Sequence, residues 1–325
     1  MTDRVGLLEH ADGIIPRYEH GYCVDDVARA LVVVSRESEP TDEVIVLARR
    51  YLYFLVQALD SDGRIHNRLG YDRHWLDKAN VEDCWGRAVW GFGVAAVRGA
   101  TPQVQAEALA SFEIILRARS PYPHAMAFAA LGAAALLDGI PGHAGARKLL
   151  ADAVLVIGRP PHDAAWPWPM NRLSYANAAI AEALMAAGSK LGDVAVTDDG
   201  LRMLRWLLDR ETRNGHLSLT PVGGRGPGTH GRGFDQQPIE AAALADACVY
   251  ALRIDDDPRW VEGLHMCIGW FLGENDSKTS LFDPVSGGGC DGLSASGRNR
   301  NQGAESTMAL MSVFQHGQHL MLAAR

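Results

Sequence analysis

Carboxylic acids recur in this sequence where long apolar segments begin. In FDQQPIEAAALADACVYAL, residues 234–252, Asp235 and Glu240 open a run that is otherwise almost wholly apolar. A carboxylate at the start of a buried helix must be paired or must face a polar cavity, because an unpaired buried charge is costly. Two such acids on facing helices can act as general acid and general base. The acids that we propose for this catalytic role are Asp25, Asp26, Glu82, Asp83, Glu240 and Glu305.

Several of these acids also have a structural explanation. Asp25 or Asp26 could cap a helix, with Arg29 as the partner one turn later. Glu82 and Asp83 could likewise cap the next helix and complement its positive end. The sequence leaves the structural and the catalytic explanations open.

Two acids are harder to explain as caps. Glu240 and Glu305 lie inside the first turn of segments expected to be buried, so each needs a partner or a polar cavity. Asp246 lies deeper in its segment, and we expect it to be a hydrogen-bonded acid of the core. Asn301, by contrast, could be a plain helix cap.

Two kinds of helical segment alternate along the chain and must position these acids. One kind is amphipathic, with an apolar stripe and a charged opposite side, and is expected on the outside. It covers residues 42–60, 102–119, 145–158, 198–211 and 257–274. The other kind is apolar nearly all round and rich in Ala and Gly, as expected of helices buried on every side. It covers residues 27–35, 86–97, 124–137, 176–188, 239–252 and 305–315.

This alternation of inner and outer helices predicts an all-α fold. Six inner and five outer segments fit six helical hairpins closed into an (α/α)6 toroid, forming a single domain over residues 1–325. The last outer position could be empty or filled by the N-terminal segment. A helical solenoid is the competing architecture, but its repeats keep a nearly fixed length, whereas the inner segments here are unevenly spaced. In a toroid the inner helices run the same way, so their polar starts converge at one mouth.

Polar and aromatic residues in the loops that enter the inner helices suggest a sugar ligand. Sugar rings stack their C–H faces on aromatic rings, and their hydroxyl groups need hydrogen-bond donors and acceptors together. RIHNRLGYDRHWLD, residues 64–77, and AAWPWPMNRLSYAN, residues 164–177, offer this combination, although a WxW motif also occurs in plain loop packing. The residues proposed for substrate binding are His20, Tyr22, Arg29, Asn67, Asp72, Arg73, Trp75, Arg87, His124, Trp166, Trp168, Tyr175, Asn177, Asp235, Gln236, Gln237, Asp291, Asn301 and Gln302.

Composition excludes several classes of partner. The chain has 325 residues and a net charge of −8, which argues against a nucleic-acid partner because such a partner needs a basic face. Five cysteines without CxxC spacing fit reduced thiols in a cytoplasmic protein. The first residues lack a signal-peptide pattern, and no stretch approaches the roughly 18 apolar residues of a membrane span. No cofactor motif and no diagnostic metal spacing appears, although grouped acids leave a calcium ion open.

A glycine-rich segment, GGRGPGTHGRG at residues 223–233, looks at first like a phosphate-binding loop. Such a loop needs the strand-to-helix context of a P-loop or a GxGxxG motif, and neither supports it here. We therefore expect a mobile loop over the mouth.

Long motifs carry a resemblance to a known family. HGYCVDDVARAL at residues 20–31, YDRHWLD with EDCWGRAVWGFG, FDQQPIEAAALADAC, and GGGCDGL with NRNQGAESTMAL together resemble the six-hairpin glycosidase-like proteins. Members of that family occur alone or fused behind glycosyltransferase domains. The resemblance covers residues 6–314 and implies an (α/α)6 toroid, an oligosaccharide or glycan substrate, and a glycosyltransferase as a partner. Arg300 departs from the uncharged residue expected before the last motif.

Three functions fit these features. A glycoside hydrolase would use two carboxyl groups, one acid from Asp25/Asp26 or Glu82/Asp83 working against Glu240 or Glu305. A sugar epimerase or isomerase would use His20 or His124 as the proton shuttle. A glycan-binding domain without catalysis would serve a glycosyltransferase. Carboxylates outnumber histidines at the inner helix starts, so the sequence favours the hydrolase, with all the acids opening on one cavity.

Overall fold

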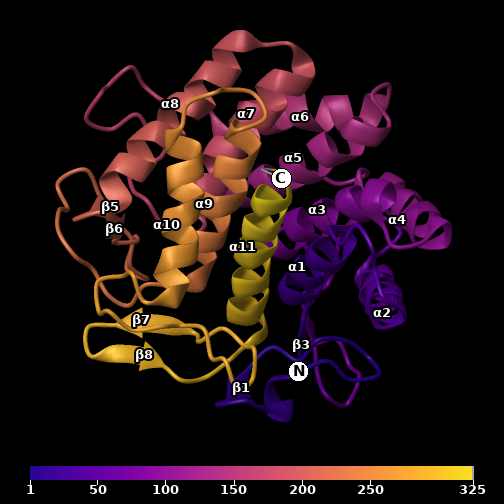
Figure 1. The fold of residues 1–325 in the computed structure, drawn as a ribbon. Coiled ribbons are helices and arrows are strands. Elements are labelled where there is room, and N and C mark those ends of the chain that lie inside the picture. The colour runs from indigo at the N-terminus through magenta and orange to yellow at the C-terminus, as the bar shows by residue number, and fades with distance from the viewer. Residues whose placement is uncertain (324–325) are drawn as a thin grey trace. The chain divides into compact units, whose positions relative to one another are not determined.

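Helices make up most of residues 1–323, which are the residues that the computed structural model describes (Figure 1). The six segments expected as inner helices are α1 (Val24–Ser35), α3 (Asp83–Arg98), α5 (Pro123–Gly139), α7 (Asn177–Leu191), α9 (Pro238–Ala251) and α11 (Ala304–Ala323). The five expected as outer helices are α2 (Asp42–Ala58), α4 (Pro102–Ile115), α6 (Ala144–Ile157), α8 (Val194–Glu211) and α10 (Arg259–Leu272). The predicted helices and their order are therefore confirmed.

The strands are short and occur only as pairs within the described residues. They are β1 (Ala11–Asp12) with β2 (Ile15–Pro16), β3 (Tyr22–Cys23) with β4 (Arg68–Leu69), β5 (Thr212–Arg213) with β6 (His216–Leu217), and β7 (Gly292–Ser294) with β8 (Gly297–Asn299). The β3–β4 pair is antiparallel, with Tyr22 opposite Leu69, and brings the residues before α1 beside the loop of residues 64–77. A 3-10 helix, η1 (Tyr18–His20), precedes β3.

The chain divides into two compact units. Unit 1 contains Met1–His10, Pro16–Ile157 and Ala186–Asp193. Unit 2 contains Ala11–Ile15, Gly158–Met185 and the chain from Val194 onward. The single domain over residues 1–325 stays a prediction.

The inner helices of unit 1 are parallel neighbours. A Cβ added to Gly86 of α3 would lie 2.1 Å from the carbonyl oxygen of Ala125 in α5, and one added to Gly93 would lie 2.2 Å from that of Gly132. These contacts advance along both helices in the same direction, so α3 and α5 run parallel. Only glycine allows so close an approach of two helix backbones.

The same relation holds between α1 and α3. Gly91 of α3 lies against Ala28 of α1. One turn earlier in both helices, Arg87 of α3 lies near Asp25 of α1. The N-termini of α1, α3 and α5 are therefore at the same end of unit 1. The sequence predicts this arrangement for inner helices.

In unit 2, α9 is the central helix, buried at almost every position. It packs against α8, α10 and α11, and Figure 1 shows α9, α10 and α11 side by side. Gly263 of α10 leaves room for the Cys248 sulfur of α9, which would lie 2.8 Å from an added Cβ. This packing explains why residues 239–252 carry no polar face.

No helix in the described part of the chain is both long enough and apolar enough to span a bilayer.

Candidate functional site

Two outer helices are capped at their N-termini by threonine side chains, whereas four inner helices, like the outer helix α10, have no side-chain cap. Thr41 caps α2 by accepting a hydrogen bond from Val44 N, and Thr101 caps α4 in the same way. The residues at the N-cap positions of α1, α3, α5 and α9, namely Cys23, Glu82, Tyr122 and Gln237, make no such side-chain bond. The first N–H groups of a helix attract anions and oxygen ligands. Uncapped inner helices therefore suit a binding site at their starts.

The expectation that Asp25, Asp26 or Glu82 caps a helix is wrong. Asp25 and Asp26 lie in the first turn of α1, after the N-cap residue. Glu82 occupies the N-cap position of α3, but its side chain is exposed and does not cap. The expected pairing is correct, because buried Asp26 forms an ion pair with Arg29 one turn later.

Asp25 joins α1 to α3. Its Oδ1 atom lies 3.4 Å from Nε of Arg87, a buried residue of α3, and Oδ2 accepts a weak bond from the Cys23 thiol at 3.5 Å. The Arg87 guanidinium in turn lies over the Phe128 ring of α5, 3.9 Å from its centroid. Three parallel inner helices thus meet through one carboxylate and one guanidinium.

Glu9, Cys23 and Asp26 form a buried cluster in which one oxygen or sulfur atom of each lies within 4.8 Å of the others. Burial, and then the charges of Asp25 and Asp26, raises the pKa of the Cys23 thiol well above its usual range. These three residues are the ones that could hold a metal ion. Arg68 pairs with Glu9 as Arg29 pairs with Asp26, so both carboxylates already have a cation, and the structure assigns no ion to the cluster.

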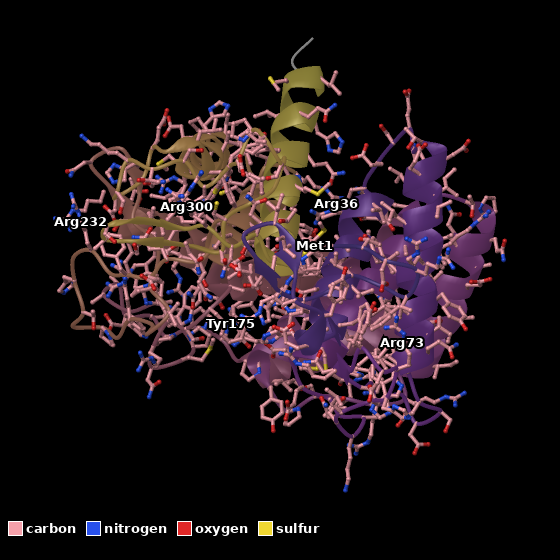
Figure 2. All side chains as sticks on the ribbon, turned by 90° about the horizontal axis from the view of Figure 1, so that it is seen from below. Met1, Arg36, Arg73, Tyr175, Arg232 and Arg300 are labelled. Atoms are coloured by element: carbon pink, nitrogen blue, oxygen red, sulfur yellow. The ribbon has the colours of Figure 1, made fainter. Side chains whose placement is uncertain are left out.

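Aromatic side chains gather beside this cluster. Tyr18 and Tyr71, both about half exposed, have ring centroids 4.9 Å apart, and Arg73 lies over the rings of Tyr71 and Tyr22 at 4.8 and 5.0 Å. Figure 2 marks Arg73 among the side chains of the N-terminal part of the chain. The Tyr22 hydroxyl donates to Asp3 at 2.6 Å and accepts from Arg73. Burial, and then the Asp3 bond, raises the pKa of Tyr22 to about 12.

The loop of residues 64–77 is held by its own polar groups. Asp77 accepts hydrogen bonds from the main-chain N–H of Asn67 at 2.7 Å, and Asn67 accepts one from the Cys23 thiol. Half-buried Trp75 stacks on the ring of His66, with centroids 4.9 Å apart. Asp72 is exposed and pairs only with His74 among the described residues.

Two histidines face each other at the entrance to α1. The rings of His10 and His20 are nearly perpendicular, with centroids 4.9 Å apart, and Nε2 of His10 lies 3.4 Å from Oε1 of Glu9. Both histidines lie in residues 9–21. Main-chain hydrogen bonds from Glu9 N to Gly21 O and from Arg17 N to His10 O hold this segment in a closed loop. Both side chains are partly exposed, at 48% and 37%. They are therefore accessible to a ligand.

The remaining candidates of unit 1 lie at the other two helix starts. Asp83 is the first residue of α3 and His124 the second of α5, and both are half-buried. Because α1, α3 and α5 are parallel, these two residues lie at the same end of the unit as Asp25.

In unit 2, Glu240 anchors the start of α7. Its Oε1 accepts from Ala176 N at 2.5 Å, and its Oε2 accepts from Asn177 N and Asn177 Nδ2 at 3.3 and 3.0 Å. Burial, and then the charge of nearby Glu211, raises the pKa of Glu240 to about 8, although the Asn177 and Ala176 bonds act the other way. The expectation that this buried acid must be paired is confirmed.

Trp166 and Trp168, proposed from the sequence as exposed rings for a sugar, are buried, and the alternative of loop packing for the WxW motif is confirmed. Their exposed fractions are 7% and 1%, because both pack on Trp206 of α8, with ring centroids 5.1 and 5.8 Å away. The Trp166 indole N–H donates to Met170 O at 2.7 Å. Tyr175, which Figure 2 labels, is half-buried in the loop just before α7.

The FDQQ segment is fixed by a polar network. Buried Gln236 donates to Asp276 Oδ2 at 2.9 Å and accepts from the Trp270 indole at 3.1 Å. Asp276 also accepts from Ser218 and lies 3.3 Å from the Arg232 guanidinium. Burial would raise the pKa of Asp276, but these bonds and the arginine together lower it. On either side of Gln236, Asp235 is exposed and Gln237 half-buried.

The NRNQG motif binds main chain rather than capping a helix. Asn301 accepts from Gly13 N at 3.0 Å, so the expectation of a plain cap is wrong. Asp291 accepts from Gly303 N at 2.7 Å, just before α11, and Gln302 donates to Asp283. Arg300 is exposed.

The two acids expected inside the core differ in burial. Glu305 of α11 is half-buried, whereas Asp246 of α9 is buried. Asp246 bonds His316 at 2.5 Å and Ser312 at 3.4 Å, which confirms it as a hydrogen-bonded core acid.

The proposed site residues fall into two groups. Unit 1 brings together the candidates at the starts of α1, α3 and α5, and unit 2 those at the starts of α7, α9 and α11. The single cavity shared by acids of both units stays a prediction. Sequence reasoning missed Glu9, His10, Glu211, Arg225 and Asp276, none of which stands at an inner helix start. An acid beside a histidine in LEHADG was the available signal for Glu9 and His10.

Solved structures show which fold these helices make. The chain is similar to a cellobiose 2-epimerase from Spirochaeta thermophila, with a TM-score of 0.69, 13% identity, and coverage of 98% of this chain and 91% of that one. A cellulase of C. cellulolyticum in complex with cellobiose matches with a TM-score of 0.66 and 8% identity, over 97% and 88% of the chains. A GH76 α-mannanase from Bacteroides thetaiotaomicron matches with a TM-score of 0.65 and 10% identity, over 93% and 88%.

No family model matches the chain, and no curated protein matches its sequence. The structural likeness at these identities establishes the fold: the chain has the (α/α)6 toroid of the six-hairpin glycosidase fold. The predicted fold class is confirmed.

Proposed function

We propose that the chain is a sugar epimerase or isomerase whose proton-transfer groups are His10 and His20. The observation that carries this proposal is the contact between the two imidazole rings at the entrance to α1. It replaces the hydrolase that the sequence favours, because the histidine expected from the sequence, His20, has a second histidine as its neighbour.

The chemistry needs two groups that exchange protons near neutral pH, which is the property of imidazole. One imidazole removes the proton from the carbon next to the carbonyl of an open-chain reducing sugar, which leaves an imidazolium and an enediolate. The other imidazole, which touches the first, lies on the same side of the sugar and can return a proton to the neighbouring carbon, while the hydroxyl proton passes from one enediolate oxygen to the other; the product is an isomer. Return of the proton to the original carbon gives an epimer once the enediolate has turned its other face toward the histidines. No oxidant or reductant is consumed.

Neighbouring groups supply the sugar contacts. Tyr18 and Tyr71 offer exposed aromatic faces for the C–H face of a sugar ring. Arg73, close to both Tyr71 and Tyr22, offers hydrogen-bond donors for the sugar hydroxyl groups. Oε1 of Glu9, 3.4 Å from Nε2 of His10, helps to hold that ring in place.

Solved proteins of the same fold support this class of function. Their names include a sugar epimerase, a D-mannose isomerase and a cellobiose 2-epimerase, all at a TM-score of 0.69. Cellulases and a mannanase follow at lower scores. Carbohydrate chemistry is common to these names, and we extend it to this chain.

The test is incubation of the protein with reducing mono- and disaccharides in heavy water, followed by proton NMR. An epimerase or isomerase converts one sugar into another and places deuterium on the carbon beside the carbonyl. His20→Ala should abolish the exchange, while His265→Ala, which removes an exposed histidine of α10, should not. New reducing ends without deuterium would contradict the proposal.

A glycoside hydrolase is the second candidate, and one observation favours it. Glu240, with a pKa raised to about 8 by burial and then by Glu211, holds a proton at neutral pH, as a general acid must. Both of its oxygens, however, accept bonds at the start of α7. Release of reducing ends from oligosaccharides, lost in Glu240→Gln, would establish this alternative.

A further inference from the structure

Arg210 of α8 lies among tryptophan rings in unit 2. Its guanidinium carbon is 5.1 Å from the ring centroid of Trp166 and 5.2 Å from that of Trp206. Its Nη2 atom donates to the carbonyl oxygens of Gly226 and Thr229 in the glycine-rich loop, at 3.0 and 2.9 Å. One arginine thus connects the tryptophan cluster to the loop that covers it.

The positive charge in this region exceeds the negative charge. Among the described residues, the buried side chain of Arg225 donates only to the carbonyl oxygens of Ser218 and Leu219. Neither Arg210 nor Arg225 forms an ion pair within the described chain.

The charges of both arginines act to lower the pKa of the same buried carboxyl group, Glu211. Burial, and then the charge of Arg225, lowers the pKa of Arg210. Two guanidinium groups therefore act on Glu211, while Glu240, the other carboxyl group near Glu211, has its pKa raised to about 8 and carries no charge at neutral pH. Buried charges are normally compensated.

Two hydrogen-bond donors in the same cluster are shielded from solvent and have no acceptor among residues 1–323. They are Nε of Arg210 and the indole N–H of Trp168, a residue that is 1% exposed. Both residues adjoin the Trp206 ring. Buried donors without an acceptor are uncommon in proteins, and an acceptor-rich ligand would satisfy them.

Two glycines give the loop of residues 223–233 backbone freedom. A Cβ added to Gly223 or Gly228 would meet nothing within 4 Å, so packing does not require glycine there. Glycine at such positions instead adds backbone freedom. The loop could therefore open and close over Arg210.

We propose that Arg210, with Arg225 and the Trp168 N–H beside it, forms a binding subsite for an oxyanion carried by a sugar, either the carboxylate of a uronate or a phosphate group. The subsite lies within unit 2 and does not depend on the proton transfer assigned to unit 1. It rests on the proposed function only in taking the ligand to be a carbohydrate.

The test is isothermal titration calorimetry with D-glucuronate, D-glucose 6-phosphate and D-glucose at low ionic strength. At least one charged sugar should bind about tenfold or more tightly than glucose, because charge-assisted hydrogen bonds are stronger than neutral ones. The preferred sugar identifies the source of the oxyanion. Equal binding of all three sugars, or no binding of any, would overturn the proposal.

Two variants locate the subsite. Arg210→Gln should lose the preference for the charged sugar, whereas Arg49→Gln, which removes an exposed arginine of α2 with the same change in net charge, should keep it. A preference that persists in folded Arg210→Gln contradicts the assignment.

The wild-type protein gives an independent check if Arg210→Gln does not fold. Raising the ionic strength should weaken the binding of the charged sugar while leaving that of glucose unchanged. A salt-independent affinity for the charged sugar would overturn the proposal. Binding is measured here without turnover, so failure of the epimerase chemistry would leave this result unaffected.

Discussion

The imidazole rings of His10 and His20 meet edge to face, with centroids 4.9 Å apart, directly before the helix that carries Asp25 and Asp26. This contact places two imidazole rings at the end of unit 1 where α1, α3 and α5 begin. Around it lie exposed tyrosines and a set of paired acids and arginines.

The link between Asp25 and Arg87 should be essential for stability. Arg87→Met removes the cation from a mostly buried carboxylate and should lower the free energy of unfolding by about 3–5 kcal/mol, the cost of breaking a buried pair. Urea denaturation measures the change. Arg17→Met, at the exposed pair with Glu19, is the control and should cost at most about 1 kcal/mol. Equal effects in the two variants would contradict a structural role for Arg87.

Glu240 should make stability depend on pH. The folded chain holds its proton up to about pH 8, whereas the unfolded chain releases it near the ordinary value of 4.5. Between these values the folded state binds more protons, so its stability is greatest at the acid end and falls as the pH rises. In Glu240→Gln this fall should be smaller.

Denaturant unfolding across that range of pH measures the slope. Glu262→Gln, which alters an exposed glutamate of α10, should keep the wild-type slope. If Glu240→Gln has the same slope of stability against pH as the wild-type protein, Glu240 is ionised in the folded chain across this range of pH.

Substitution of Trp168 should change stability, whereas substitution of Tyr71 should change sugar binding. Trp168→Ala removes a side chain that is 1% exposed and should lower the free energy of unfolding by about 3–5 kcal/mol. Tyr71→Ala removes one that is 47% exposed and should weaken sugar binding while leaving the thermal midpoint nearly unchanged. Calorimetry measures both effects, and a large loss of stability in Tyr71→Ala would assign that ring to packing.

The five cysteines should be unreactive in the folded protein. All are buried and free, and burial raises the pKa of each thiol, which lowers the fraction of reactive thiolate. A colorimetric thiol reagent should therefore react slowly with the native chain. In denaturant, it should react with all five thiols. Rapid reaction of any native thiol would contradict its burial.

The helices could be predicted because each has a clear hydrophobic pattern. Residues 239–252 are apolar all round, and α9 is buried on every side, whereas residues 42–60 have one apolar face and α2 buries only that face. The predicted ring followed from the number and order of these segments. Asp246 could be assigned to the core because it lies deep in an apolar helix.

The site could be predicted only in part, since side-chain partners come from distant segments. Trp166 looks like an exposed loop residue in the sequence. It is covered by Trp206, which belongs to α8, about 40 residues later in the chain. Asn301 looks like a cap, but Gly13 provides its partner. His10 was missed because its neighbour His20 belongs to a separate motif, and only the folded chain brings the rings together.

Deuterium exchange tests the central proposal most directly. Wild-type protein incubated in heavy water with a panel of reducing sugars should convert one of them into an epimer or isomer that carries deuterium beside the carbonyl carbon. His10→Ala and His20→Ala should each lower the rate by about 100-fold or more, the usual contribution of a positioned acid–base group, while His265→Ala stays at the wild-type rate. Exchange that survives in both folded His10→Ala and His20→Ala, or release of new reducing ends without exchange, would contradict the account.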